Sequence, residues 1–496
     1  MPDGTTRNID DGNPTEATAL LAGIDHGLAR TPLPKLQLGS LYLTKLVVPV
    51  AATQIMPYVN ELVQRFEFTD NPARIGVYSG LIGSASLWAQ LISTYPWGRL
   101  SDSAGRRPVI LAGTAGIGIA AVMFGFSRSF AALLVARIIS GLFAGNVATM
   151  HSVVGELTDA TNQSIAFPVY DLCSALGFVV GPLVGGLLAN PGERWIMFSS
   201  KLWKTYPYAL PCLATAALAT LALLAGSLIL KETLPAKRSA EHKQSLDAVE
   251  SSIVDAPDPE VLFVEARADA LQPPTTRELL THPPLRAVLI AGVVMAFLAS
   301  AFNAVFVLFC YTPVRIGGLG FSPSEIGRAL AISGSTSAVM KLFLMPYLLQ
   351  RFHILSLYTF TLRTWPITFL LFPLLNYIAQ ESAGAHTALL WAAVTLVAVM
   401  SRIGTLAFSI SMILVRETAP GAASLGASNA FAEISQSLAI GISPVFVSWI
   451  FGLSIEARAF NGYGWTGVMA LIGLSGSWFV RRIGVAQRVH AQGLVE

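Results

Sequence analysis

Twelve long apolar stretches decide what this 496-residue chain can fold into. A helix needs about 20 mostly apolar residues to cross the hydrocarbon layer of a membrane. The stretches of this length lie at residues 39–61, 75–97, 108–127, 131–153, 165–190, 207–230, 286–311, 323–349, 354–378, 386–412, 424–452 and 464–482. Only 12% of the residues are charged, against about 25% in soluble proteins. We therefore expect an all-α membrane protein with twelve transmembrane helices in a lipid bilayer.

One polar segment divides the twelve stretches into two groups of six. Residues 231–285 are rich in Glu, Asp, Pro and Ser and have little periodicity, which is typical of a flexible linker. We expect a six-helix bundle at 39–230 and another at 286–482, with polar tails at 1–38 and 483–496. The net charge of +3 gives no indication of nucleic-acid binding.

The two groups of stretches repeat one another. Gly83-Ser84 in the second stretch aligns with Gly334-Ser335 in the eighth, at an offset of 251 residues. In the fifth and eleventh stretches, Asp171 aligns with Glu433 at an offset of 262. We therefore expect two pseudo-symmetric bundles related by an axis along the membrane normal.

The basic residues predict how the chain is oriented. With the N-terminus inside, most of the 32 Lys and Arg residues fall on the inner side, as membrane proteins prefer. We thus expect both termini and the linker in the cytoplasm, and the plasma membrane as the location. An acidic-dileucine pattern at 16–21 leaves the vacuolar membrane as the alternative.

A charged turn joins the second and third stretches. It carries two glycines, an acid and two adjacent arginines at the spacing Gly98-x-x-x-Asp102-x-x-Gly105-Arg106-Arg107. This string resembles the loop between spans 2 and 3 of the major facilitator superfamily. The resemblance implies a gating role for these five residues, with Asp102 bonding near the inner end of span 11 and pairing with arginines of its own loop. The alternative is a solvated turn that only sets topology.

A row of small residues in the fifth stretch resembles a motif of one branch of this superfamily. The row consists of Gly177, Gly181, Pro182, Gly185 and Gly186, and such spacing also allows ordinary close packing of helices. The string resembles the span 5 signature of the twelve-span drug:proton antiporters. The end of the sixth stretch, Lys231-Glu-Thr-Leu-Pro235, is also similar to sequences in that branch.

Within that branch, two further strings resemble fungal and plant zinc-induced-facilitator-like carriers. They are Trp97-Gly98 before the charged turn and the glycine-rich run at 317–322. The early cysteine-proline signature of the plant carriers is absent, because the first stretch reads Gln54-Ile-Met-Pro57-Tyr58.

Charges inside the stretches are costly and therefore indicate function. Asp171 and Glu433 are the deep carboxylates and are our candidates for carrying protons, although both could simply pair with loop arginines. Arg137 begins an Arg-x-x-x-Gly string that resembles the span 4 motif linked to proton coupling. Its alternative role is to hold carbonyl groups of span 1.

Several polar residues are candidates for lining a substrate cavity. Each could equally form a hydrogen bond between helices. They are Gln54, Asn146, Asn303, Lys341, Arg402 and Gln436. Five embedded basic residues against two acids favour an anionic or neutral substrate over a cation.

These observations predict a secondary active transporter rather than an enzyme. We expect it to export a small organic molecule, such as a drug or secondary metabolite, in exchange for protons and to work as a monomer. The three cysteines have no ligand-like spacing, so neither a metal nor a cofactor is expected. The alternatives are a vacuolar or ion-homeostasis carrier and, from other classes, a membrane-embedded enzyme or a non-transporting receptor.

Overall fold

The computed structural model describes residues 32–66, 74–159, 162–234, 281–382, 387–419 and 425–492. Within these ranges the regular structure is entirely helical, which confirms the predicted fold class. Eleven helical segments are long and apolar enough to cross a membrane, and Gly464–Val480 is a shorter apolar helix. Most of the linker and of the N-terminal tail, including the dileucine pattern, lies outside the described residues.

The N-terminal half contains six spans, of which the first and fourth are each made of two helices. Their helices are α2 (Lys35–Thr53) with α3 (Val59–Arg65), α4 (Ile75–Ala104), α5 (Arg106–Gly125), α6 (Phe130–Ala144) with α7 (Val147–Glu156), α8 (Gln163–Leu188) and α11 (Ala209–Ile229). The short helices α9 (Pro191–Arg194) and α10 (Lys201–Thr205) connect α8 to α11.

The C-terminal half repeats this plan with three divided spans. Its helices are α14 (Pro283–Tyr311), α15 (Pro323–Val339) continued by η6 (Met340–Leu344) and α16 (Met345–Arg351), α17 (Ile354–Leu370) with α18 (Phe372–Glu381), α19 (Ala388–Thr405) with α20 (Ala407–Thr418), α21 (Leu425–Glu456) and α22 (Gly464–Gln492). The segment η6 is a π-helix. The core of the C-terminal half is strongly aromatic: Phe302, Phe372 and Trp465 are fully buried and pack together.

The turn between α4 and α5 depends on a glycine. Gly105 has φ 107°, a conformation that residues with a side chain rarely adopt. A Cβ atom at this position would also come within 2.5 Å of the Glu232 carboxylate. Gly105 is therefore required both by the backbone of the turn and by the close approach of the chain after α11.

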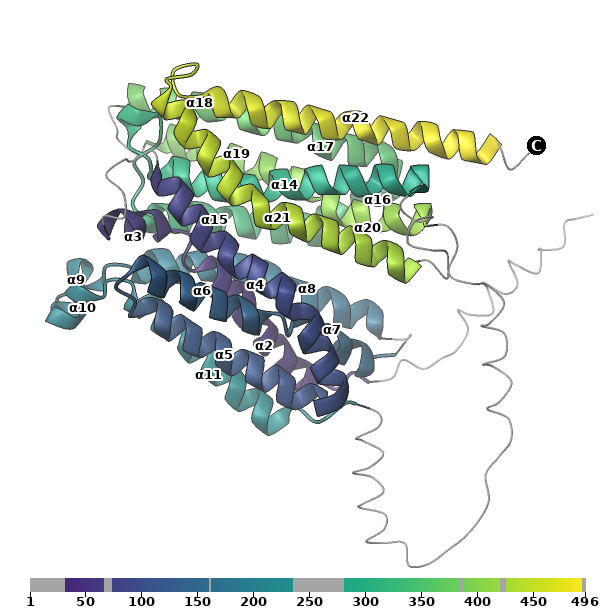
Figure 1. Cartoon of the computed structure of the whole chain (residues 1–496), viewed down its shortest axis with the longest axis horizontal. Coiled ribbons are helices and arrows are strands. Elements are labelled where there is room, and N and C mark those ends of the chain that lie inside the picture. The colour runs from purple at the N-terminus through teal and green to yellow at the C-terminus, as the bar shows by residue number, and fades with distance from the viewer. Residues whose placement is uncertain are drawn as a thin grey trace, which may run out of the picture.

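The two halves lie side by side, with the N-terminal half in purple to teal and the C-terminal half in green to yellow (Figure 1). Two helix pairs, α4 with α21 and α8 with α15, form the main contacts between them. We name the two ends of the molecule by their features: the α9 side carries α9 and α10, and the Gly105 side carries the turn between α4 and α5.

The contacts between the halves are tightest toward the α9 side. A Cβ on Gly186 would meet the Pro323 carbonyl oxygen at 2.6 Å and the Gly327 Cα at 3.0 Å. A Cβ on Gly80 would meet the Pro444 carbonyl oxygen at 3.0 Å. Backbones of the two halves therefore touch here without intervening side chains.

Candidate transport cavity and charged cluster

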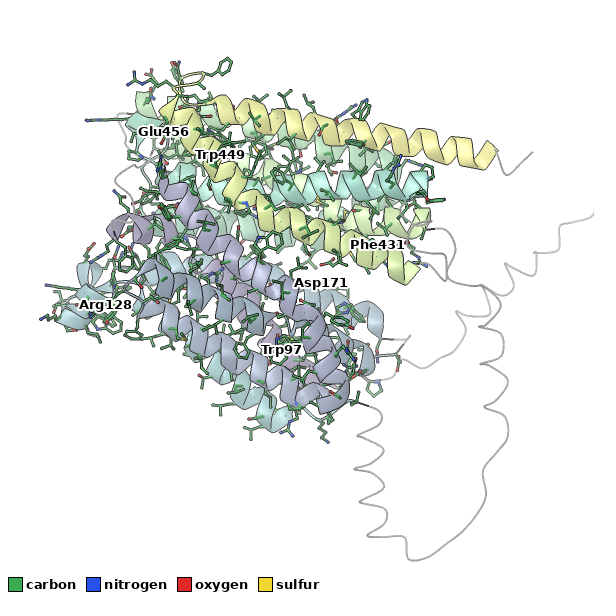
Figure 2. All side chains as sticks on the ribbon, in the orientation of Figure 1. Trp97, Arg128, Asp171, Phe431, Trp449 and Glu456 are labelled. Carbon is green, nitrogen blue, oxygen red and sulfur yellow. The ribbon has the colours of Figure 1, made fainter. Side chains whose placement is uncertain are left out.

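A cavity of about 1090 Å³ lies between the two halves. Helices of both halves line it, and Figure 2 shows Asp171 at the boundary between them. Its charged lining residues are Arg137 and Asp171 from the N-terminal half and Lys341, Arg402 and Glu433 from the C-terminal half. The volume suits an organic molecule of drug-like size.

Arg137 is held in the wall of this cavity by α4. Only 5% of Arg137 is exposed. Its Nε donates to the Ile82 carbonyl oxygen at 3.2 Å, and Nη2 donates to the Ser86 hydroxyl at 2.6 Å. The carbonyl partner expected for Arg137 thus comes from span 2 and not from span 1, because α6 packs against α4.

Arg402 occupies the matching place in the other half. It is 9% exposed, and its Nε donates to the Ser333 hydroxyl at 2.8 Å. Its Nη2 donates to Asn303 Oδ1, also at 2.8 Å. Ser333 lies 251 positions after Ile82, so both arginines reach the same level of spans 2 and 8. Two charges are thus buried with hydrogen-bond partners, as buried charges require.

Asp171, Lys341 and Glu433 are instead exposed within the cavity. Neither acid forms an ion pair with any residue that the structure describes. The charged neighbours of Asp171 are Lys45 and Lys341, which act on it electrostatically across a longer distance. Lys45 is itself buried, with its Nζ 4.7 Å from the centre of the Tyr170 ring.

Two of the expected cavity residues lie elsewhere, which corrects the sequence-based prediction. Gln54 is 2% exposed and faces the interior of its own half, where its Oε1 accepts from the Tyr58 hydroxyl at 2.9 Å. Asn146 is fully buried, and its Nδ2 donates to the Ile110 carbonyl oxygen at 3.3 Å. Gln54 Nε2 also donates to Cys212 Sγ of α11 at 3.5 Å, so both side chains connect helices within the N-terminal half. Asn303 and Gln436 do line the cavity.

The glycines of span 5 face two different neighbours. Gly177, Gly181 and Gly185 lie against α2, where a Cβ on Gly185 would come within 1.7 Å of the Gln54 carbonyl oxygen. Gly186 faces Gly327 of the other half, and a Cβ on Gly327 would in turn lie 2.6 Å from the Pro182 carbonyl oxygen. The row therefore packs span 5 tightly within its own half and also forms the contact between halves.

Charged residues cluster at the Gly105 side of the N-terminal half. Arg106 Nη1 lies 2.6 Å from Asp102 Oδ1, and its Nε lies 3.0 Å from Glu156 Oε1. The Asp102 side chain is 66% exposed and its ion pair is with its own loop. The start of span 11, where a further partner for Asp102 was expected, is only described from residue 425.

Glu232 completes this cluster by capping α5 from outside the helix. It accepts from the backbone N–H groups of Arg106 at 2.8 Å and Arg107 at 3.2 Å. Burial raises the pKa of Glu232, but four backbone N–H donors outweigh this effect and hold the pKa below its usual value. Neither Glu156 nor Glu232 was among our site candidates; the signal for Glu232 was the Lys-Glu-Thr string that ends span 6.

Comparison with known proteins places the chain among membrane transporters. The chain is 34% identical to the major facilitator-type transporter psiT2 of Psilocybe cyanescens, over 90% of both chains. It is 26% identical to the multidrug transporter mfsB of Aspergillus fumigatus, over 86% of this chain and 79% of that one. It is 27% identical to the ZINC INDUCED FACILITATOR 1 protein of Arabidopsis thaliana, over 64% and 65%. The resemblance to efflux carriers and zinc-induced facilitators is thus confirmed.

A solved structure agrees at the level of the fold. The peptide transporter POT in complex with sulfate has a TM-score of 0.64 and 15% identity, with 94% of this chain and 99% of that one covered. The family described as Major Facilitator Superfamily matches residues 46–444. The chain therefore belongs to the major facilitator superfamily and is a membrane transporter, not an enzyme.

Proposed function

We propose that this transporter exports a small organic molecule in exchange for protons. The observation that carries the proposal is the cavity between the halves, into which the two deep carboxylates, Asp171 and Glu433, are exposed. A carboxylate that faces a water-accessible cavity can take up and release a proton, whereas one locked in an ion pair resists protonation. Export is supported by the antiporter motif of span 5 and by the similarity to a multidrug transporter.

Alternating access would couple the export of the substrate to the opposite movement of protons. The halves touch toward the α9 side, at Gly186 with Gly327, while the exposed Asp171, Lys341 and Glu433 lie nearer the Gly105 side. The distribution of basic residues favours the cytoplasm for the Gly105 side. The structure would then be the state that loads substrate from the cytoplasm, and rocking of the halves would open the α9 side.

The charged cluster at the Gly105 side would control that rocking. Gly98, Asp102, Gly105, Arg106 and Arg107 form the turn that must approach the other half when the Gly105 side closes. Asp102 is the cluster's exposed carboxylate, so it is available for a contact across the halves. We expect Asp102→Asn to insert normally and to transport slowly, measured at equal amounts of protein in the membrane.

Arg137 and Arg402 would provide constant positive charges along the transport pathway. Each is buried and bound to the neighbouring span of its own half. Their charges therefore stay in place when the carboxylates gain or lose protons. We propose that Arg137 assists coupling by favouring the ionised forms of the acids that share the cavity, since an opposite charge stabilises a carboxylate.

A resistance screen in a pump-deficient host tests the proposed export. The chain should protect cells from some weak-acid or neutral toxins better than from lipophilic cations, because three basic residues outnumber two acids in the cavity lining. Protection should fall when the membrane pH gradient is collapsed. No protection against any toxin, with the protein present in the plasma membrane, would argue for import or for an intracellular location.

The second candidate function is vacuolar or ion-homeostasis transport of the zinc-induced-facilitator type. It is supported by the similarity to the Arabidopsis protein of that name. A fluorescent fusion that locates to the vacuolar membrane would favour this candidate, and one at the cell periphery would favour export.

In either location we propose a functional monomer, since residues of a single chain line the whole cavity.

A further inference from the structure

The two walls of the cavity differ in charge at equivalent positions. Gln90 in α4 and Lys341 in η6 both line the cavity and are separated by the 251-residue offset that relates spans 2 and 8. The two arginines of the lining, Arg137 and Arg402, match across the halves. The C-terminal wall thus carries a second cation where the N-terminal wall carries a neutral amide.

The backbone of span 8 presents this second cation to the cavity. Lys341 lies in the π-helix of residues Met340–Leu344, which interrupts span 8 between α15 and α16. Single-turn π segments within α-helices occur frequently at functional sites. Lys341 is exposed to the cavity, although the helix crosses a region in which free charges are costly.

Lys341 and Arg402 line the same wall of the cavity, and Lys341 experiences both the positive charge of Arg402 and the larger opposite effect of Asp171 from the other half. Two like charges on one wall repel each other, so this arrangement favours an anion between them. Asn303 adds a polar group to the same wall. Its Oδ1 accepts from Arg402, which leaves the amide N–H groups as the donors that Asn303 offers.

The acids of the cavity act on these cations at a distance but form no ion pair with them. Asp171 is on the opposite half, and neither Asp171 nor Glu433 lies within 4.0 Å of a described basic nitrogen. The remaining lining is largely apolar and includes Phe178, Phe408 and Met412. An amphipathic molecule with one acidic end would match this lining.

We propose that Lys341, Arg402 and Asn303 form a subsite for the acidic group of the substrate, a carboxylate or a phosphate. The apolar body of the substrate would lie against Phe178 and Phe408. This inference rests on the proposed transport of an organic molecule and adds the chemical class of the substrate. It also separates the roles of the charges: the C-terminal wall binds the oxyanion, and Asp171 and Glu433 carry protons.

Binding to the purified full chain, at equal pH throughout, tests the subsite without requiring transport. The probes are radiolabelled 1-naphthylacetate, 1-naphthyl phosphate and the neutral 1-naphthylacetamide. The variants are Lys341→Gln, which gives the C-terminal wall the residue of the other half, and the double variant Gln90→Lys with Lys341→Gln, which moves the charge across the cavity.

We expect the wild type to bind at least one acidic probe more tightly than the amide. Lys341→Gln should weaken acid binding about tenfold or more, as loss of a charged hydrogen bond does, and leave the affinity for the amide within about twofold. Unchanged amide binding also shows that the variant is folded. The acid that binds more tightly distinguishes a carboxylate from a phosphate substrate.

Three results would overturn the subsite. They are no preference of the wild type for either acid, an equal loss of acid and amide binding in Lys341→Gln, and full recovery of acid binding in the double variant. The last result would mean that only the net charge of the cavity matters. Intact acid binding without pH-driven transport would instead contradict the proposed proton coupling and leave the subsite standing.

Discussion

At the scale of single residues, the structure separates charges that are buried and hydrogen-bonded from charges that are exposed in the cavity. Arg137 and Arg402 each have two hydrogen-bond partners and little exposure. Asp171 and Glu433 are exposed in the cavity. The proposed proton exchange would use both kinds: the buried arginines as constant positive charges and the exposed carboxylates as proton carriers.

Glu232 offers a test at this scale, because it caps α5 from the end of span 6. Glu232→Gln should lower the stability of the protein by no more than about 1 kcal/mol, as loss of a partly exposed helix cap does. Since the pKa of Glu232 is lowered in the folded protein, its contribution is complete above about pH 4.3, the ordinary pKa of Glu. The contribution is lost as the pH falls through the lowered value.

Thermal unfolding in detergent, followed by intrinsic tryptophan fluorescence, measures this effect in acid as well as at neutral pH through the buried Trp365 and Trp465. The difference between wild type and Glu232→Gln should be constant at neutral pH and shrink in acid. Glu193→Gln, which changes an exposed acid of α9, is the matched control and should unfold like the wild type. A gap that widens as the pH falls would contradict the assigned role of Glu232.

The residue scale also shows how far sequence reasoning reaches into the site. A polar residue in an apolar helix is costly, so it indicates a functional position. This criterion correctly placed four residues in the cavity: Asn303, Lys341, Arg402 and Gln436. Gln54 and Asn146 met the same criterion and lie elsewhere. Polarity alone does not distinguish a helix face that turns to the cavity from one that turns to a neighbouring helix of the same half.

At the scale of helices, the boundaries were largely predictable and the interruptions were not. Apolar length located all twelve spans, because the membrane fixes the length of a helix that crosses it. The break between α2 and α3 and the π-helix η6 left no mark in the hydropathy pattern. Pro57 lies in the break between α2 and α3, and Pro346 lies at the start of α16, just after η6. A proline removes a backbone donor and interrupts a helix, yet it leaves the apolar length of the stretch unchanged.

The contact between α8 and α15 offers the test at this scale. Gly186→Val should place a side chain against backbone atoms of Pro323 and Gly327. Backbone cannot move aside as a flexible side chain can, so the halves should separate on the α9 side and the outward-open state should gain population. Gly467→Ala is the control, because the added Cβ would meet no described atom within 4 Å other than those of its own stretch of helix.

Spin labels on the two halves measure the separation. Cysteines introduced at Met197 and Arg315 are exposed and lie on the α9 side of the N- and C-terminal halves. Distances between the labels should shift toward longer values in Gly186→Val and stay unchanged in Gly467→Ala. An unchanged distribution in a folded Gly186→Val protein would mean that this contact does not close the α9 side.

At the scale of the whole molecule, the two halves share a plan and differ in chemistry. The internal repeat predicted the plan, which the pairing of α4 with α21 and of α8 with α15 follows. Because the C-terminal half has Lys341 where the N-terminal half has Gln90, the charge of the cavity lining is asymmetric, with the excess of positive charge on the C-terminal wall. The domain limits at 39–230 and 286–482 remain predictions, since the chain between the halves is described only at its two ends.

The measurement that tests the account most directly is pH-driven transport in proteoliposomes by the wild type and by Asp171→Asn combined with Glu433→Gln. The probe is a compound against which the chain confers resistance. With an acidic lumen, the wild type should accumulate the probe as protons leave. The double variant should lose this accumulation but still exchange probe at symmetric pH, because its cavity remains intact. Full pH-driven accumulation by the double variant would contradict the proposed proton carriers.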